Sequence, residues 1–166
     1  SFVAGTRTLT VANVAPTLTL SGVAAVNEGA SYTLGITGSD VAGTADPLSY
    51  SINWGDGSAP QVVATGGNVT HVFADDQDGT LNATARTISV TASDGDGGSI
   101  VKTRAVTVNN VAPKATVSGA ATAPEGSTYL LSVGAVTETG ADTRTGYTIA
   151  WGDGSSSTYT PAQWAA

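Results

Sequence analysis

The chain has 166 residues, which is long enough for one β-sandwich domain and part of a second. Its 13 acidic and 6 basic residues give a net charge of −7, which argues against binding to nucleic acid or anionic membranes because both need basic patches. There is no cysteine, so disulfides and zinc–thiolate sites are excluded, and no apolar run approaches the roughly 18 residues of a membrane span.

Short runs in which apolar and polar residues alternate predict β-strands along the chain. Around Tyr50 and Ile52, for example, every second residue is apolar, which indicates a strand with one buried face. No stretch of residues 14–110 has a helical period, and about seven strands there predict a Greek-key sandwich. In chain order, the expected strands cover residues 8–11, 17–20, 32–36, 48–54, 61–63, 69–73, 87–92 and 100–108.

The motif Trp54-Gly55-Asp56-Gly57-Ser58 returns 97 residues later at 151–155, which indicates a tandem repeat. A large aromatic residue before Gly-Asp-Gly is typical of a strand that runs into a tight turn, in which the aspartate accepts N–H groups of its own loop. The same offset relates Val14-Ala15-Pro16 to residues 111–113. We therefore expect three parts: the last strand of a preceding repeat with its linker (1–13), a complete repeat (14–110), and the front part of a second, incomplete repeat (111–166).

Several motifs resemble signatures of the PKD domain, an immunoglobulin-like β-sandwich found in tandem on bacterial extracellular proteins. Residues 50–58, Thr70-His71-Val72-Phe73 and residues 88–94 are similar to the W-G-D-G, H-x-Y/F and TVTVTD motifs of that family. The family usually has a Pro-Gly turn where this chain has residues 75–79. The resemblance implies an all-β, immunoglobulin-like (PKD-type) Greek-key sandwich in tandem, and a module of an extracellular or cell-surface bacterial protein.

Catalysis finds little support in the sequence. His71 is the single histidine, and no Gly-x-Ser-x-Gly elbow or cysteine accompanies it as a nucleophile. We expect His71 to lie beside Trp54 and to bond to backbone groups. Asp56 is expected to cap its own turn, because glycoside hydrolysis needs a pair of carboxylates across a cleft. The chain is therefore predicted not to be an enzyme.

Acidic residues gather in the expected loops, where carboxylate and carbonyl oxygens can bind calcium. Strand alternation places Asp40, Asp46, Asp94 and Asp96 beside Asn13, at the end where the chain arrives in the complete repeat. The acidic residues at the opposite end, together with Glu28 and the asparagines after the last strand, resemble the cadherin arrangement, in which calcium stiffens the joint between sandwiches. Solvated loops that keep an acidic protein soluble are the alternative, and both remain open. The candidate calcium ligands are Glu28, Asp56, Asp75, Asp76, Asp78, Asn109 and Asn110.

Two functions fit these features. The first is a non-catalytic structural or adhesive repeat that acts as a spacer or assembly element and is stiffened by calcium. In that case residues 1–13 can add as a strand to a neighbouring repeat or to the incomplete unit of another copy. The second is a polysaccharide-binding accessory domain of a secreted hydrolase, with Tyr159 or Trp164 stacked on sugar rings.

Overall fold

The computed structural model describes residues 5–76 and 83–164, with the side chain of Trp164 left out. The chain divides into two compact units, Ser1–Val111 and Ala112–Ala166. Within the described residues, no helix is both long and apolar enough to span a membrane. Each unit is described separately below.

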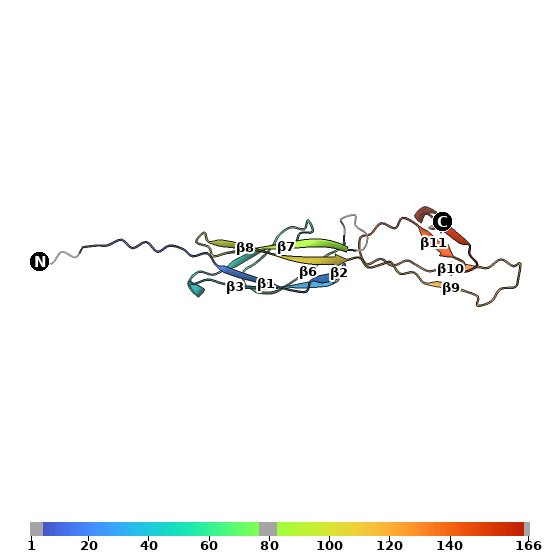
Figure 1. Ribbon diagram of the computed structural model, residues 1–166, viewed down its shortest axis with the longest axis horizontal. Coiled ribbons are helices and arrows are strands. Elements are labelled where there is room, and N and C mark those ends of the chain that lie inside the picture. The colour runs from blue at the N-terminus through green and yellow to red at the C-terminus, as the bar shows by residue number, and fades with distance from the viewer. Residues whose placement is uncertain (1–4, 77–82, 165–166) are drawn as a thin grey trace. The chain divides into compact units, whose positions relative to one another are not determined.

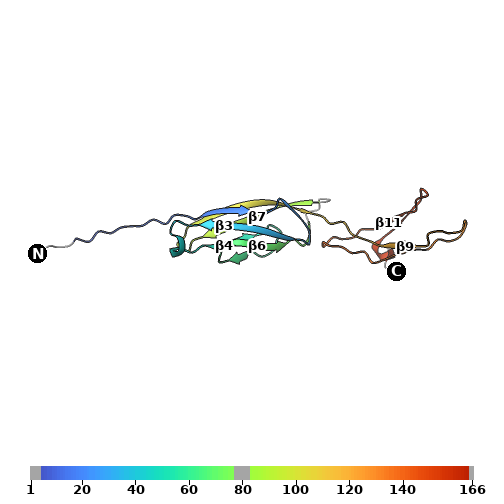
Figure 2. The same ribbon diagram turned by 90° about the horizontal axis from the view of Figure 1, so that it is seen from below.

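The first unit is a β-sandwich of two facing sheets (Figures 1 and 2). All strand pairs in it are antiparallel except β2 and β8, which pair in parallel. In the order of their hydrogen bonding, the first sheet consists of β1 (Thr17–Ser21), β3 (Ser31–Ser39) and β6 (Gly67–Val72). The second sheet consists of β2 (Ala25–Asn27), β8 (Ser99–Asn109), β7 (Ala83–Ser93), β4 (Ser49–Asn53) and β5 (Gln61–Val63).

The core lies between these sheets and follows the predicted alternation of apolar residues. Ile52 of β4 lies opposite Val90 of β7 in the ladder, and both side chains are completely buried. The expected all-β sandwich and its inward faces are therefore confirmed, while the short strand β2 has no counterpart among the expected strands. The buried apolar residues are Leu18, Tyr32, Leu34, Ile36, Tyr50, Ile52, Trp54, Phe73, Ile88, Val90, Ala92, Val106 and Val108.

The loops also follow the sequence patterns closely. The 94–98 segment forms the expected hairpin turn between β7 and β8, with the Asp94 N–H donating to the Gly98 carbonyl at 3.2 Å. The predicted polar loop between β3 and β4 contains one 3-10 turn, η1 (Gly43–Ala45). In Figure 1 this turn, drawn in teal, lies at the end of the sandwich where the blue N-terminal segment arrives.

Residues 5–16 form no strand, although the sequence predicts one at residues 8–11. Leu9 is 85% exposed and Val11 is 84% exposed. The 97-residue offset aligns these two side chains with Val106 and Val108 of β8, which are buried because β7 and β2 flank them. No such flanking strands adjoin residues 5–13 within the described chain, so this segment lacks the ladder that makes β8 a strand.

The second unit contains two separate antiparallel ladders. None of its described residues is buried, and Trp151, the counterpart of Trp54, is 39% exposed. A one-turn helix, which the sequence pattern does not predict, follows the last strand. Thr160 and Gln163 form a capping box at its start, in which each side chain accepts the other's backbone N–H. The elements are β9 (Val117–Gly119), β10 (Leu131–Val133), β11 (Tyr147–Ala150), β12 (Ser156–Tyr159) and α1 (Pro161–Trp164).

Candidate functional site

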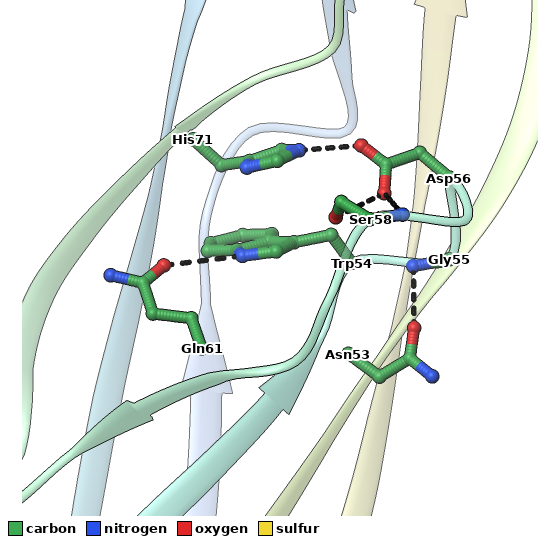
Figure 3. A network of polar contacts seen from close by, with 7 residues as sticks. All are labelled: Asn53, Trp54, Gly55, Asp56, Ser58, Gln61 and His71. Carbon is green, nitrogen blue, oxygen red and sulfur yellow. Dashed lines mark hydrogen bonds and ion pairs between the residues drawn. The ribbon is translucent and has the colours of Figure 1, made fainter.

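The candidate site in the first unit is the corner that follows β4. Trp54 is 1% exposed, and its indole N–H donates to Oε1 of Gln61 at 3.2 Å (Figure 3). The imidazole of His71 stacks on the indole with ring centroids 4.5 Å apart and planes 7° apart. Tyr32 and Phe73 meet the indole edge-on, each at 6.4 Å. The corner is therefore a closed aromatic cluster, and its faces are already covered by the protein itself.

The turn after Trp54 is held by short-range hydrogen bonds. Oδ1 of Asn53 accepts the Gly55 N–H at 2.9 Å, and Oδ1 of Asp56 accepts the Ser58 N–H at 3.0 Å and the Ser58 hydroxyl at 2.6 Å. Gly55 has φ of 77°, and a Cβ there would lie 2.5 Å from a backbone oxygen of β7. Glycine is thus required twice over, for its dihedral angle and for the close approach to β7.

Asp56 also links the two sheets. Nε2 of His71, on β6, donates to Oδ2 of Asp56 at 2.6 Å, whereas Asp56 itself follows β4 in the opposite sheet. Burial raises the pKa of Asp56, but the bonds from Ser58 and His71 outweigh this and lower the pKa to about 2. The expected position of His71 beside Trp54 is confirmed, but the expected bond to backbone is wrong, because the Asp56 carboxylate lies within reach.

The order of these groups does not suit nucleophilic catalysis. In a Ser-His-Asp triad the imidazole stands between the hydroxyl and the carboxylate, so that it can take the hydroxyl proton. Here the carboxylate of Asp56 stands between Ser58 and His71. A carboxylate with a pKa of about 2 is a poor base at neutral pH, so the arrangement pins the turn and does not activate the hydroxyl.

A family model described as the PKD domain matches residues 13–108, which include this corner and the strands around it. The chain belongs to the PKD domain family. PKD domains are immunoglobulin-like β-sandwich modules, and the match confirms the resemblance seen in the sequence motifs. No curated protein matches the chain.

Two solved structures are similar to this PKD domain. One is the PKD domain of an M14-like peptidase from Thermoplasmatales archaeon SCGC AB-540-F20, with 22% identity and a TM-score of 0.46 over 58% of this chain and 98% of that one. The other is the PKD1 domain of Vibrio anguillarum Epp, with 20% identity and a TM-score of 0.43 over 58% of this chain and 96% of that one.

The downstream end of this PKD domain, where β8 leads out, brings together part of the expected calcium set. Oxygens of Glu28, Asp75 and Asp76 lie within 4.8 Å of one another. Both Glu28 oxygens accept backbone N–H groups, from Asp76 at 3.2 Å and from Val111 at 2.6 Å, and the Glu28 N–H donates to the Asn109 carbonyl at 3.0 Å. Glu28, which is 1% exposed, thus clips the outgoing chain to the sandwich.

The remaining expected ligands have different positions. Asp56 is bonded to His71 and Ser58 and stands outside the group around Glu28. Oδ1 of Asn110 is buried and has no hydrogen-bond partner in the part of the chain that the structure describes. The Asn109 side chain donates to Asn27 at 3.3 Å. Asp78 lies outside the described residues, and the calcium set as a whole stays a prediction.

The upstream end, where residues 5–16 lead in, carries a second acidic group. Oxygens of Asp40, Asp46 and Asp94 lie within 4.8 Å of one another. The Asn13 side chain donates to Oδ2 of Asp94 at 2.9 Å, and this bond lowers the pKa of Asp94 although burial opposes it. Burial, followed by the charges of Asp94, Asp96 and Asp40, raises the pKa of Asp46.

Two of these features had no specific signal in the sequence. The Asp56–His71 bond joins residues from different sheets. Only a sequence motif whose spacing reflects how the two sheets face each other could have predicted it. The clip made by Glu28 reaches 83 positions along the chain to Val111. Glu28-Gly29 recurs at residues 125–126 with the same 97-residue offset, but this recurrence does not indicate which groups Glu28 bonds to.

Proposed function

We propose that this PKD domain is a non-catalytic spacer and assembly module of a bacterial secreted or cell-surface protein. The observation that carries the proposal is that the sandwich binds its connecting segments at opposite ends. Asn13 is tied to Asp94 upstream, and Val111 is tied to Glu28 downstream. Between these ties runs the 11-residue strand β8, which spans roughly 33 Å at about 3.3 Å per residue.

A spacer needs joints that restrict the direction of the outgoing chain, and the Glu28 clip supplies this at the downstream end. Its two oxygens accept N–H groups from Asp76, in the loop after β6, and from Val111 of the outgoing segment, so a single carboxylate ties the two together. Charge-assisted bonds of this kind are about twice as strong as neutral ones. The aligned residue in the second unit, Glu125, is exposed and offers a matched control.

Joint stiffness can be measured directly because the chain has no cysteine of its own. Spin labels on V62C and V117C, at positions that are 71% and 66% exposed, give a distance distribution between the two units by double electron–electron resonance. We expect a narrow distribution that broadens in Glu28→Gln and stays narrow in Glu125→Gln. A distribution in the parent chain as broad as that of Glu28→Gln would contradict the spacer role.

The assembly part of the proposal rests on the uncovered segment 5–13. Leu9 and Val11 point their apolar side chains into solvent, although their counterparts in β8 are buried. Such a segment can pair with a neighbouring repeat or with another copy of the chain by strand addition. Leu9→Asp with Val11→Asp should reduce association in sedimentation velocity, whereas Thr8→Asp with Thr10→Asp, on the other face, should not. A monomer at all concentrations in the parent chain would contradict this part.

Calcium at the downstream end is a further part of the proposal. Oδ1 of Asp75 is buried and lacks a hydrogen-bond partner within the described residues, as does Oδ1 of Asn110. Asp75 belongs to the group around Glu28, and Asn110 precedes Val111, whose N–H bonds to Glu28. Carboxylate and amide oxygens are of the type that calcium prefers. Melting with millimolar calcium and with chelator tests it: we expect a higher midpoint with calcium in the parent chain and no rise in Asp75→Asn. Equal midpoints in the parent chain would contradict it.

Glycan binding is a second candidate function, and one feature of the second unit favours it. Tyr129 and Trp151 are 40% and 39% exposed and line one open hollow of 470 Å³ with Asp153. Exposed aromatic faces of this kind can stack on sugar rings. A pull-down on insoluble polysaccharides, with Trp151→Ala and Trp164→Ala compared against the parent chain, should show saturable binding that one of them abolishes. Without binding by the parent chain, the candidate fails.

A further inference from the structure

The two sheets of the sandwich differ in width, and the difference falls on one side. β1 lies against β8, and β6 lies against the corner after β4, where His71 stacks on Trp54. β5 is the strand beyond β4 in the wider sheet, so no strand of the narrower sheet lies opposite it within the described residues. One strand position beside β6 is therefore vacant.

The inner side of β5 is only partly covered as a result. Val63 lies opposite Tyr50 in the β4–β5 ladder and Gln61 lies opposite Ile52, so both point inward like their buried partners. Both are nevertheless only half-buried. Val63 packs against the core, and Gln61 accepts the indole N–H of Trp54 (Figure 3). A strand added beside β6 would cover this side of the core.

The edge of β6 has none of the usual protection against strand pairing. Natural edge strands are protected by proline, charged side chains or bulges. β6 pairs with β3 without a bulge, contains no proline, lysine or acidic residue, and turns the ring of its histidine inward onto Trp54. Its outward backbone groups are therefore suited to binding a further strand.

The opposite side of the sandwich is closed by the chain itself, which crosses there from β1 to β2. The Thr107 N–H of β8 donates to the Ala24 carbonyl of this crossing at 2.9 Å. The guanidinium of Arg104, also on β8, donates to the Gly22 carbonyl. Of the two sides, the β6 side is thus the one that leaves room for an added strand.

We propose, on the basis of the assembly role proposed above, that the edge of β6 accepts residues 7–12 of a second copy as an added antiparallel strand. The vacancy is one strand wide, so a single extended segment fits it. A whole sandwich paired edge to edge through β6 would instead bring its own β5 into the second sheet of its partner. The same chain cannot supply the strand as readily, because its residues 7–12 lead into β1, which β3 separates from β6.

The apolar residues of the segment match the inner side of β6. Val69 and His71 point inward, because they lie opposite buried residues of β3. Leu9 and Val11 are also two residues apart, so they share one face of an extended segment. In antiparallel register Leu9 lies beside His71, and Val11 then lies beside Val69. Both apolar side chains point toward the inner side of β5, where they lose their exposure to water.

The outer face and the charges fit the same register. Thr10 pairs with Thr70, and cross-strand threonine pairs stabilise antiparallel sheets. Arg7, the single charged residue of segment 5–16, falls beside Phe73, two residues before Asp75. The net charge of the chain is −7, so a segment with one positive charge is attracted to this acidic end.

A cysteine pair tests the register directly, because the chain has no cysteine of its own. Full chains carrying Thr10→Cys and Thr70→Cys are mixed in a glutathione redox buffer, and mass spectrometry quantifies the mixed disulfide. Thr33→Cys is the matched control, since Thr33 is exposed and lies directly opposite Thr70 on β3, one strand further from the edge. We expect the Thr70 pair to exceed the Thr33 pair by about tenfold or more, because a disulfide needs adjacent Cβ atoms.

Equal yields of the two pairs would overturn the β6 edge as the acceptor. A disulfide formed preferentially with Thr158→Cys, at an exposed position of β12, would assign the acceptor to the second unit. That result would overturn the β6 edge and leave the assembly role standing. A parent chain that stays monomeric at every concentration and forms none of these disulfides would remove both.

A charge under the added strand provides a second test by sedimentation velocity. Val63→Lys places an ammonium group where Leu9 and Val11 would pack, whereas Val62→Lys adds the same charge on the outer side of β5. We expect self-association to weaken about tenfold or more in Val63→Lys and less than about twofold in Val62→Lys. Equal effects would contradict the proposal. The disulfide test stands by itself if Val63→Lys fails to fold.

Discussion

Replacing Trp54 and Trp151 separately tests whether the same motif is a core element in one unit and a surface element in the other. Trp54 is 1% exposed and packs against Tyr32, Phe73 and His71. An indole buries roughly 200 Å², which at about 25 cal/mol per Å² corresponds to about 5 kcal/mol as an upper bound. Trp-to-Ala changes in cores cost about 3–5 kcal/mol, and we expect Trp54→Ala to fall in that range.

Trp151→Ala is the matched control, because it has the same chemistry in a unit without buried residues. It should leave the free energy of unfolding of the first unit within about 0.5 kcal/mol of the parent value. Amide exchange of Ile88 and Val90 under mild urea reports the first unit alone, since both residues lie in the middle of β7. A loss below about 1 kcal/mol in Trp54→Ala, or equal losses in both variants, would refute the role of the corner in the core.

Three further predictions concern the same corner and the downstream clip. Because the pKa of Asp56 is about 2 when folded and 3.8 ordinarily, its contribution of about 2 kcal/mol is complete above pH ~4 and is lost as the pH falls through about 2. Asp56→Asn should therefore flatten the dependence of unfolding free energy on pH in that window, and an unchanged slope would contradict the pairing. Glu28→Gln should cost about 1–3 kcal/mol in urea denaturation and Glu125→Gln less than about 0.5, so equal costs would argue against the clip. Gly55→Ala should destabilise its unit by more than about 2 kcal/mol, since its Cβ would meet the β7 backbone at 2.5 Å. Gly152→Ala has the same left-handed φ but open space around it, so about 1 kcal/mol is expected in thermal melts, and a cost as large as that of Gly55→Ala would contradict the steric argument.

The parts of the fold that could be predicted from the sequence are those with a local cause. The turn after Trp54 recurs after Trp151, where Asp153 accepts the Ser155 N–H at 2.8 Å and the hydroxyl at 2.6 Å. It forms there without a core, so the Gly-Asp-Gly-Ser sequence is sufficient to specify it. The buried face of each strand could be predicted from the alternation of apolar and polar residues, because the two-residue period is a property of the strand alone.

Contacts that depend on how the two sheets face each other could not be predicted in this way. The sequence indicated that His71 lies near Trp54, but the choice of Asp56 over a backbone group depends on the distance between β6 and the corner after β4. Among the described acids of the first unit, Asp40, Asp46 and Asp94 meet at one end of the sandwich and Glu28, Asp75 and Asp76 at the other, as the order of strands and loops predicted. Which acids find backbone donors, as Glu28 does, and which find none, as Asp46 does, is decided by the packing of the loops.

The opposite positions of the two tied linkers have a mechanical consequence. A pull applied through the incoming and outgoing segments acts along β1 and β8, parallel to the strands and across their hydrogen bonds (Figure 1). The β7–β8 ladder, with 11 residue pairs in register, would then be sheared as a whole instead of being unzipped one rung at a time. Tension is thus borne by many bonds together, which suits a module that must keep its length while under load.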